Sequence, residues 1–384
     1  MKNIRIRQID IWIYAMYMVM FKIYAMPQVL QQAYKVMLLG GVLIYLFLHM
    51  DLRRFLNGSL LFSAFVVVAT VLGYMSDCVP LSDLFNGFQF ALCLFALYTL
   101  FLHCKDLGYT SQTVDCLWRI TGVFCAVSLI SILIQGTSPD GTTITYFFGN
   151  KFATSYFFLM FAGLSQVRYY QQIQQSLLYR FGAVALALIA IAISGWIYCS
   201  TSMVAGVVLV AAPLLPKKLR RFAMHPATVV VVMLLCGIFP LIMEPIMSSK
   251  LVQYVVVNGL GESLSLTGRK KIYRYLLDVI GTRLAFGYGY GNDAVWQVVG
   301  FGNAQNGLMQ YIVDYGACGT IFFLVTVYRC VNKAKKKDWV WGAFALLYAM
   351  IVASLVEISY GYLFFMALFL LCWAEDSHTS LTET

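Results

Sequence analysis

Charged residues are scarce in this sequence: Asp, Glu, Lys and Arg together make up only 11% of its 384 residues. Hydrophobic residues make up 61% and aromatic residues 16%, and the mean hydropathy is +0.77. A soluble globular domain carries about 25% charged residues, so this composition excludes that class of protein. We therefore expect an all-α, polytopic integral membrane protein with a single membrane domain over residues 1–384.

Paired cysteines and clustered histidines are also missing. The ten cysteines are scattered without a CxxC spacing, and most lie within or beside apolar runs, where Cys packs as a small hydrophobic residue. On the topology derived below, every histidine maps to the inner end of a span or to the inner tail. This excludes an outer-face mechanism that uses a His base or a His-ligated metal. The histidines are His49, His103, His225 and His378.

Apolar runs of roughly 17–22 residues, the length that a helix needs to cross the bilayer core, recur along the chain. We predict about 12 spans. The first apolar run is followed at once by another and has no small-residue cleavage site, so it is interpreted as a membrane helix rather than a signal peptide. The predicted spans are Ile9–Met26, Tyr34–Met50, Ser59–Met75, Leu84–Leu102, Val114–Ile134, Phe152–Val167, Leu178–Tyr198, Ser202–Leu215, Thr228–Met243, Gly307–Tyr328, Trp339–Val356 and Ile358–Trp373.

Lysine and arginine gather at every second connection between these spans, which predicts that both termini are cytoplasmic. The connections 76–83 and 135–151 are polar and nearly free of cations, as outer loops should be. The formal net charge of +10 follows from this bias and does not require a nucleic-acid partner. The basic connections contain Lys2, Arg5 and Arg7; Arg53 and Arg54; Lys105; Arg168 and Arg180; Lys217, Lys218, Arg220 and Arg221; and Arg329, Lys333, Lys335, Lys336 and Lys337.

One long connection, residues 244–306 between the ninth and tenth spans, breaks the charge pattern. The alternation of spans places it outside, yet its stretch 267–291 (TGRKKIYRYLLDVIGTRLAFGYGYG) carries five basic residues. The stretch predicts an amphipathic helix at the outer interface, with Thr267 as its cap, Gly268 in its first turn and Gly281 as its stop. Its apolar face consists of Ile272, Leu276, Val279 and Ile280, and its polar face of Lys271, Arg274 and Asp278.

The first turn of this helix is the predicted centre of the chemistry. Free backbone N–H groups and the positive end of the helix dipole lie there beside Arg269 and Lys270, an arrangement suited to a phosphate or pyrophosphate. The alternative is that these cations contact anionic lipid headgroups. The glycines of GYGYGN (287–292) add little, because a phosphate-binding glycine loop should connect a strand to a helix and no strand is expected here.

Three further features map to the same side. Asp314 lies inside a predicted span, where an unpaired carboxylate costs about 2.5–3.5 kcal/mol, so it should face a cavity with a partner or be neutral and hydrogen-bonded. The sequence GNKFATS (149–155) places Asn150 and Lys151 at the membrane edge. The small-residue turn YCSTSMVAG (198–206) favours close helix packing, and Ser200 within it lacks a base that could make it a nucleophile.

Taken in this order, these elements resemble the O-antigen ligase and polysaccharide polymerase family. The resemblance rests on GNKFATS, the STS turn, GRKKIYRYLLDVIG, GYGYGN and a Gln-Asn pair before LMQYIVDYGACG. It is closest to the Wzy-type polymerases of capsule, exopolysaccharide and O-antigen clusters. It implies a glycosyltransferase of the bacterial cytoplasmic membrane that joins repeat units carried on undecaprenyl pyrophosphate, at the outer face. A flippase and a chain-length regulator are the implied protein partners.

This reading assigns expected roles to residues. A lipid pyrophosphate is already a good leaving group, so cations suffice to neutralise it and neither a metal nor another cofactor is required. Arg269 is the first choice for the pyrophosphate, with Lys270 and Arg283 behind it. The acceptor is a sugar hydroxyl of another lipid-linked unit, and its base is Asp314 or Asp293. The remaining predicted substrate contacts are Gln305, Asn306, Asn150 and Lys151.

Three other functions stay open. Ligases of this family commonly carry His-Asn where this chain has Gln305 and Asn306, and Gln cannot take a proton, which disfavours a ligase. A flippase or transporter would be expected to show two related halves and helices broken at the midplane, and the single large outer loop disfavours it. A non-catalytic scaffold of an envelope-assembly complex is compatible with the composition.

Overall fold

The computed structural model describes residues 7–24, 26–51, 60–138, 144–259 and 269–372. Within these ranges the chain folds into helices and contains no β-strand, apart from an isolated bridge between Tyr146 and Gly149. Six helices are long and apolar enough to cross a membrane, and shorter apolar helices accompany them. The expectation of an all-α protein is confirmed, and the apolar helices are those of a membrane protein.

Each predicted span coincides with a helix. The first helix is shorter than predicted, because Phe21 is extended and α1 ends at Met20 rather than Met26. The helices at the predicted spans are α1 (Gln8–Met20), α2 (Gln28–His49), α4 (Leu60–Met75), α5 (Leu81–Asp106), α6 (Thr110–Gln135), α7 (Lys151–Arg168), α9 (Leu177–Trp196), α10 (Ser200–Ala211), α12 (Pro226–Met247), α16 (Gly307–Ala334), α17 (Trp341–Ala353) and α18 (Tyr362–Cys372).

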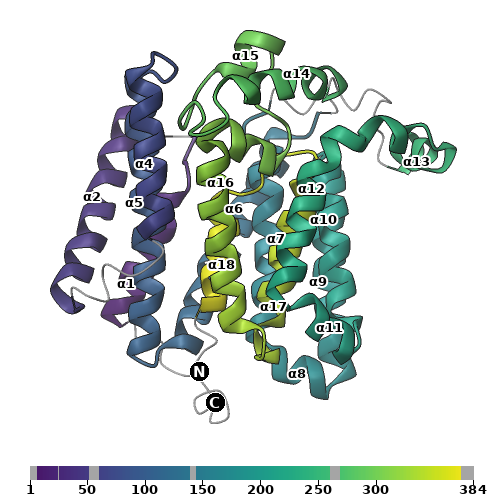
Figure 1. Cartoon of the computed structure of the whole chain (residues 1–384). Helices are drawn as coiled ribbons and strands as arrows, with labels where there is room; N and C mark the ends of the chain where they lie inside the picture. Colours follow the sequence, from purple (N-terminus) through teal and green to yellow (C-terminus); the bar gives the residue numbers. More distant parts are fainter. Residues whose placement is uncertain (1–6, 25, 52–59, 139–143, 260–268, 373–384) are drawn as a thin grey trace.

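The other helices cover the two ends of this bundle (Figure 1). Short helices α8 (Tyr170–Gln175), α11 (Lys217–Ala223) and the 3-10 turn η3 (Asp338–Val340) lie at one end, called here the basic end. At the opposite end, called the α14 end, lie α13 (Lys250–Tyr254), a π-helical turn (Val255–Gly259), α14 (Arg269–Thr282) and α15 (Ala294–Val299). The 3-10 turn η1 (Ala212–Leu214) extends α10.

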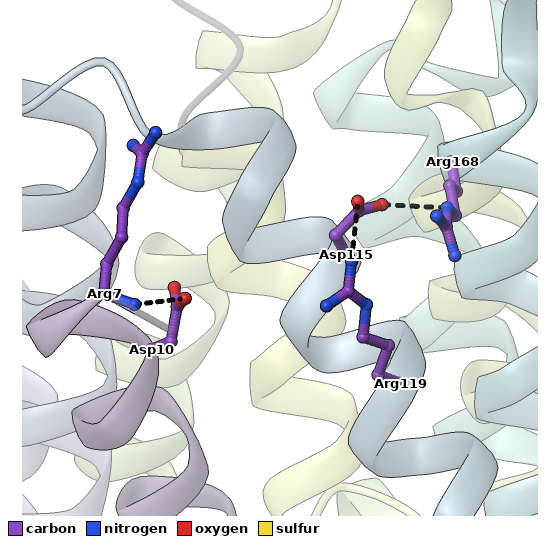
Figure 2. A network of polar contacts seen from close by, with 5 residues as sticks. All are labelled: Arg7, Asp10, Asp115, Arg119 and Arg168. Atoms are coloured by element: carbon purple, nitrogen blue, oxygen red, sulfur yellow. Dashed lines mark hydrogen bonds and ion pairs between the residues drawn. The ribbon is translucent and has the colours of Figure 1, made fainter. Parts of the chain in front are cut away.

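Cations at the basic end tie neighbouring helices together (Figure 2). The Asp115 carboxylate of α6 forms an ion pair with Arg168 of α7 at 2.8 Å. It forms a longer ion pair with Arg119 of its own helix at 3.8 Å. The Arg168 guanidinium also lies over the Trp118 ring, 4.1 Å from its centroid. Arg168, one of the cations predicted to be cytoplasmic, therefore also helps to hold α6 and α7 together. The described cysteines are all free, and all but Cys78 and Cys318 are buried, which agrees with their predicted packing role.

The predicted amphipathic helix is present as α14. Its polar face, with Lys271, Arg274 and Asp278, is exposed. Its apolar face packs against α15, the end of α12 and the start of α16, in a satellite core that includes Ile272, Leu276, Val279 and Ile280. The predicted cap Thr267 and the first-turn residue Gly268 lie outside the described residues.

The long connection between α12 and α16 contains several helices, and part of it packs within the bundle. Beyond the one predicted helix it contains α13, the π-helical turn and α15. Residues 284–292, called here the inserted segment, pack between helices: Tyr290 stacks on Phe90 of α5 with ring centroids 5.3 Å apart. The backbone of the glycine and tyrosine turns in this segment is paired with that of α16.

The inserted segment fills a break in α16. Gly316 has φ +65°, which interrupts the helix, and the freed N–H groups of Ala317 and Cys318 donate to the carbonyls of Leu284 and Ala285. On the other side of the break, Tyr288 N–H donates to the Val313 carbonyl at 2.8 Å. A Cβ on Gly316 would lie 2.3 Å from the Ala285 carbonyl oxygen, so the sequence needs glycine at this position.

Candidate functional site

Arg269 is buried at the α14 end of the bundle. It is the first described residue of α14, and only 8% of its surface is exposed. Its Nε donates to the Val356 carbonyl at 3.0 Å, in the segment that joins α17 to α18. Burying a guanidinium costs free energy unless charges or hydrogen bonds compensate, so a cation held here is unlike one that contacts headgroups from the surface.

Glu357 is the acidic residue of this site, and the sequence analysis did not find it. It follows the carbonyl that Arg269 contacts, is 8% exposed, and its Oε1 accepts the Ile358 N–H at 3.1 Å. Burial raises the pKa of the Glu357 carboxyl, while this hydrogen bond and the charges of Arg269 and Lys151 oppose the rise. A carboxyl group with a raised pKa beside a buried cation is typical of functional sites.

Asn150 and Lys151 lie at the start of α7 in the same region. The Asn150 side chain caps α7 by accepting the Ala153 N–H at 3.1 Å, and it is exposed. Lys151 Nζ donates to the Tyr198 carbonyl at 3.0 Å, which ties α7 to the turn before α10. The structure thus brings Lys151 and Arg269 within electrostatic range of the same carboxyl group, that of Glu357.

A buried hydroxyl group lies beside these charges. Tyr156, one turn into α7, is within electrostatic range of Glu357 and Arg269. Its hydroxyl has no hydrogen-bond partner among the described residues. A buried donor left without a partner is costly, which makes this hydroxyl a candidate contact for a bound ligand.

An apolar cavity of about 180 Å³ lies against Arg269, which is the one charged residue among the described residues of its wall. The wall is formed by α10, α12, the turn region after α12, α14 and the end of α17. Ser200 and Thr201 contribute hydroxyls, and the rest of the wall is aliphatic or aromatic. The lining residues are Ser200, Thr201, Val204, Phe239, Ile246, Met247, Val252, Val256, Arg269, Val352, Leu355 and Val356.

The Gln305-Asn306 pair holds this region in place. Asn306 is fully buried and caps α16: its Oδ1 accepts the Met309 N–H, and its Nδ2 donates to the carbonyls of Cys236 and Leu355. Gln305 has φ +50°, its amide donates to Asn303, and its carbonyl accepts the Tyr273 hydroxyl at 2.8 Å. This geometry favours a structural role for Asn306 over the predicted contact with a sugar.

Asp314 belongs to a separate buried polar cluster. Its Oδ1 accepts Nε2 of Gln310 at 2.7 Å and Nδ2 of Asn292 at 2.8 Å. Asn292 also donates to the Gly289 carbonyl, so the carboxyl group fastens the inserted segment to α16. Among the described residues Asp314 makes no ion pair with a cation. Its hydrogen bonds are those of the alternative in which it is buried within the bundle.

The remaining predicted residues lie apart from Arg269. Arg283 follows the far end of α14, roughly 20 Å along the helix from Arg269 at 1.5 Å per residue, with its guanidinium over the Tyr288 ring. Asp293 is exposed and accepts a hydrogen bond from Gln297 at 2.8 Å. The Lys270 side chain lies outside the described part of the structure.

The site therefore combines a buried cation, a buried carboxyl group, a second cation and an apolar cavity. In the residues that the structure describes, no group of three or more His, Cys, Asp or Glu side chains could hold a metal ion. The arrangement can bind an anion that carries a long apolar tail, with the anion at Arg269 and the tail in the cavity. Searches against protein-family models, curated proteins and solved structures find no match to this chain.

Proposed function

We propose that the chain is a polysaccharide repeat-unit polymerase of the bacterial cytoplasmic membrane. It would transfer a glycan from undecaprenyl pyrophosphate to a sugar hydroxyl of another lipid-linked unit. The observation that carries the proposal is the buried Arg269 in the wall of an apolar cavity. A polyprenyl pyrophosphate needs both features, because its head carries charge and its tail is a hydrocarbon.

In this proposal the chain crosses the membrane about 12 times, with both termini cytoplasmic and the α14 end outside. The helices at the predicted spans and the cations of the basic end support this topology. It places Arg269 and Glu357 at the outer face, where lipid-linked repeat units would be joined.

The chemistry follows from the charges. The acceptor oxygen forms a bond to the anomeric carbon as the bond from that carbon to the pyrophosphate oxygen breaks. Arg269 stabilises the negative charge that develops on the departing pyrophosphate, and Lys151 adds a second positive charge nearby. Glu357 takes the proton of the acceptor hydroxyl, because its carboxyl group lies within electrostatic range of both cations and burial raises its pKa, which strengthens it as a base.

A transporter of lipid-linked sugars is the second candidate, since a broken helix such as α16 is common in transporters. However, the break at Gly316 is closed by the inserted segment, whose backbone pairs with both sides of it. A transport route would require this segment to leave. The polymerase is therefore preferred.

The test is a reaction of the purified, reconstituted protein with lipid-linked repeat units. These units are isolated from a strain that lacks the gene for this protein and therefore accumulates single repeats. A polymerase yields a ladder of lipid-linked products that differ by one repeat. A ligase yields material attached to a different acceptor lipid, a transporter moves the lipid unchanged, and a scaffold gives neither result. Any of these three outcomes would replace the proposal.

A further inference from the structure

A groove of about 610 Å³ lies between α2 and α5, away from the cavity at Arg269. It begins at the α14 end, since α5 starts beside the inserted segment: a Cβ on Gly291 would lie 2.7 Å from the Asp83 side chain. The polar side chains of the groove come from the N-terminal parts of the two helices. They are Gln28 and Gln32 of α2 and Ser82, Asn86 and Gln89 of α5.

The lining differs between the two helices. Side chains three or four residues apart lie on one face of a helix, and on α2 this face passes from Gln28 and Gln32 to Val36, Leu39, Gly40 and Leu43. On α5 the polar side chains alternate with the Phe85 and Phe88 rings before Leu92. This lining fits an amphiphile whose head hydrogen-bonds to amides and packs on aromatic rings, and whose tail is a hydrocarbon.

Lys35 is a cation next to the groove residues of α2. It lies between Gln32 and Val36, is partly buried, and is within electrostatic range of Cys93 on α5 and of Lys22. It makes no ion pair with a described residue. A lysine next to a groove that carries several amides and the Phe85 ring suits a phosphorylated saccharide: the ammonium would bind the phosphate, and the amides and the ring would bind the sugar.

We propose that this groove binds the acceptor substrate, a second polyprenyl-pyrophosphate-linked saccharide. The inference rests on the proposed function, because a polymerase must hold two lipid-linked units at once, and the cavity at Arg269 accounts for one of them. Both hollows begin at the same end of the bundle, where the two saccharides must meet. The five neutral hydrogen-bonding side chains favour a sugar head over the charged head of a bulk phospholipid.

Gly40 offers a variant that closes the groove without disturbing the fold. It lines the groove on α2, and a Cβ added there would meet nothing within 4 Å. Gly40→Phe therefore places a ring in the apolar part of the groove. Gly182→Phe is the matched control, because Gly182 also has nothing within 4 Å and lines a different cavity near Trp118 and Tyr169 at the basic end.

The experiment uses the full chain in nanodiscs and two photoreactive probes. One is a polyprenyl pyrophosphate that carries one N-acetylhexosamine and a benzophenone in its chain, and the other is phosphatidylglycerol with the same benzophenone. Labelled peptides are mapped by mass spectrometry. We expect the sugar-bearing probe to label α2 or α5 in preference to phosphatidylglycerol. Gly40→Phe should reduce this labelling by about tenfold or more, and Gly182→Phe should not.

The two proposals fail separately in this experiment. Arg269→Ala should reduce labelling of α12 and α17 and leave that of α2 and α5 unchanged, whereas Gly40→Phe should do the reverse. If the wild-type protein is labelled specifically at α2 and α5 but not at α12 and α17, the donor site is wrong and the acceptor groove stands. Equal labelling of the groove by phosphatidylglycerol, no labelling there, cross-links between α2 helices of two copies, or unchanged labelling of the Gly40→Phe variant would each overturn the acceptor groove.

Discussion

Arg269 is a cation that the fold buries rather than exposes, although it lies at the start of the amphipathic helix α14. Arg274, on the polar face of the same helix, is exposed. The two residues have the same charge and lie on the same helix, so they separate a specific anion site from general attraction to anionic lipids. This contrast makes them a matched pair for substitution.

Arg269→Ala should lower kcat/KM for the lipid-linked donor by roughly 10- to 150-fold, the worth of one charge-assisted hydrogen bond of about 1.5–3 kcal/mol. Arg269→Lys should recover part of this loss, because Lys keeps the charge without the bidentate fork. Arg274→Ala should stay near wild type. Steady-state kinetics with the three variants provides the measurement, and equal losses for Arg269→Ala and Arg274→Ala would assign the effect to lipid electrostatics.

Glu357 should give the protein a characteristic pH dependence. Because burial raises its pKa, the folded protein holds a proton that the unfolded chain releases, and the free energy of unfolding falls as pH rises from the ordinary carboxyl range to the raised pKa. Glu357→Gln should flatten that slope and stop polymerisation while the protein still folds. Thermal unfolding in detergent from acidic to neutral pH measures the slope. An unchanged slope, or full activity of the Gln variant, would remove Glu357 from the site.

The sequence marks Arg269 as a candidate site residue and does not mark Glu357, for a physical reason. Arg269 stands out because it breaks a charge rule that the rest of the chain obeys. Glu357 lies between two predicted spans. The cation near it, Arg269, contacts the preceding residue Val356 from 87 positions away in the sequence, and such a contact cannot be read from the sequence. Asn306 shows the converse: its residue type fitted a sugar contact, and its place at the start of α16 made it a helix cap.

At the scale of elements, hydrophobic length predicted the helices well because each helix buries its own backbone polar groups in hydrocarbon. The same reasoning missed the inserted segment. GYGYGN reads as a surface turn, but its N–H and C=O groups find partners in the broken α16, so it can lie inside the bundle. This pairing depends on the break in α16 at Gly316. The sequence does not predict that break, because a single glycine within an apolar helical run does not show whether the helix is interrupted there.

Gly316→Ala should therefore destabilise the protein. The substitution puts a side chain on a residue with φ +65° and against the Ala285 carbonyl, and the strain alone costs about 1–2 kcal/mol. Gly182→Ala in α9 is the control, because its Cβ meets open space, and it should raise stability by up to about 1 kcal/mol. Differential unfolding of the two variants checks the prediction. Equal stability of Gly316→Ala and wild type would mean that the inserted segment does not fasten α16.

At the scale of the whole molecule, the proposed topology assigns the α14 end and the basic end to opposite sides of the membrane, and this assignment can be tested. Cysteine placed at Asp278 on α14 should react with an impermeant maleimide in intact cells, and cysteine placed at Lys218 on α11 should react only after permeabilisation. Both residues are exposed in the structure, and Cys78 and Cys318, the described native cysteines that are not buried, are first replaced by serine. The reverse pattern of labelling would invert the proposed topology and move Arg269 to the cytoplasmic face.

The central claim, that this chain joins lipid-linked repeat units at Arg269, is tested most directly by product length. Purified wild-type protein and the Arg269→Ala and Arg274→Ala variants are reconstituted with the same lipid-linked repeat units, and the products are separated by size. The account predicts ladders from the wild type and from Arg274→Ala, with unjoined single repeats from Arg269→Ala. A wild-type ladder from Arg269→Ala, or single repeats from all three proteins, would contradict it.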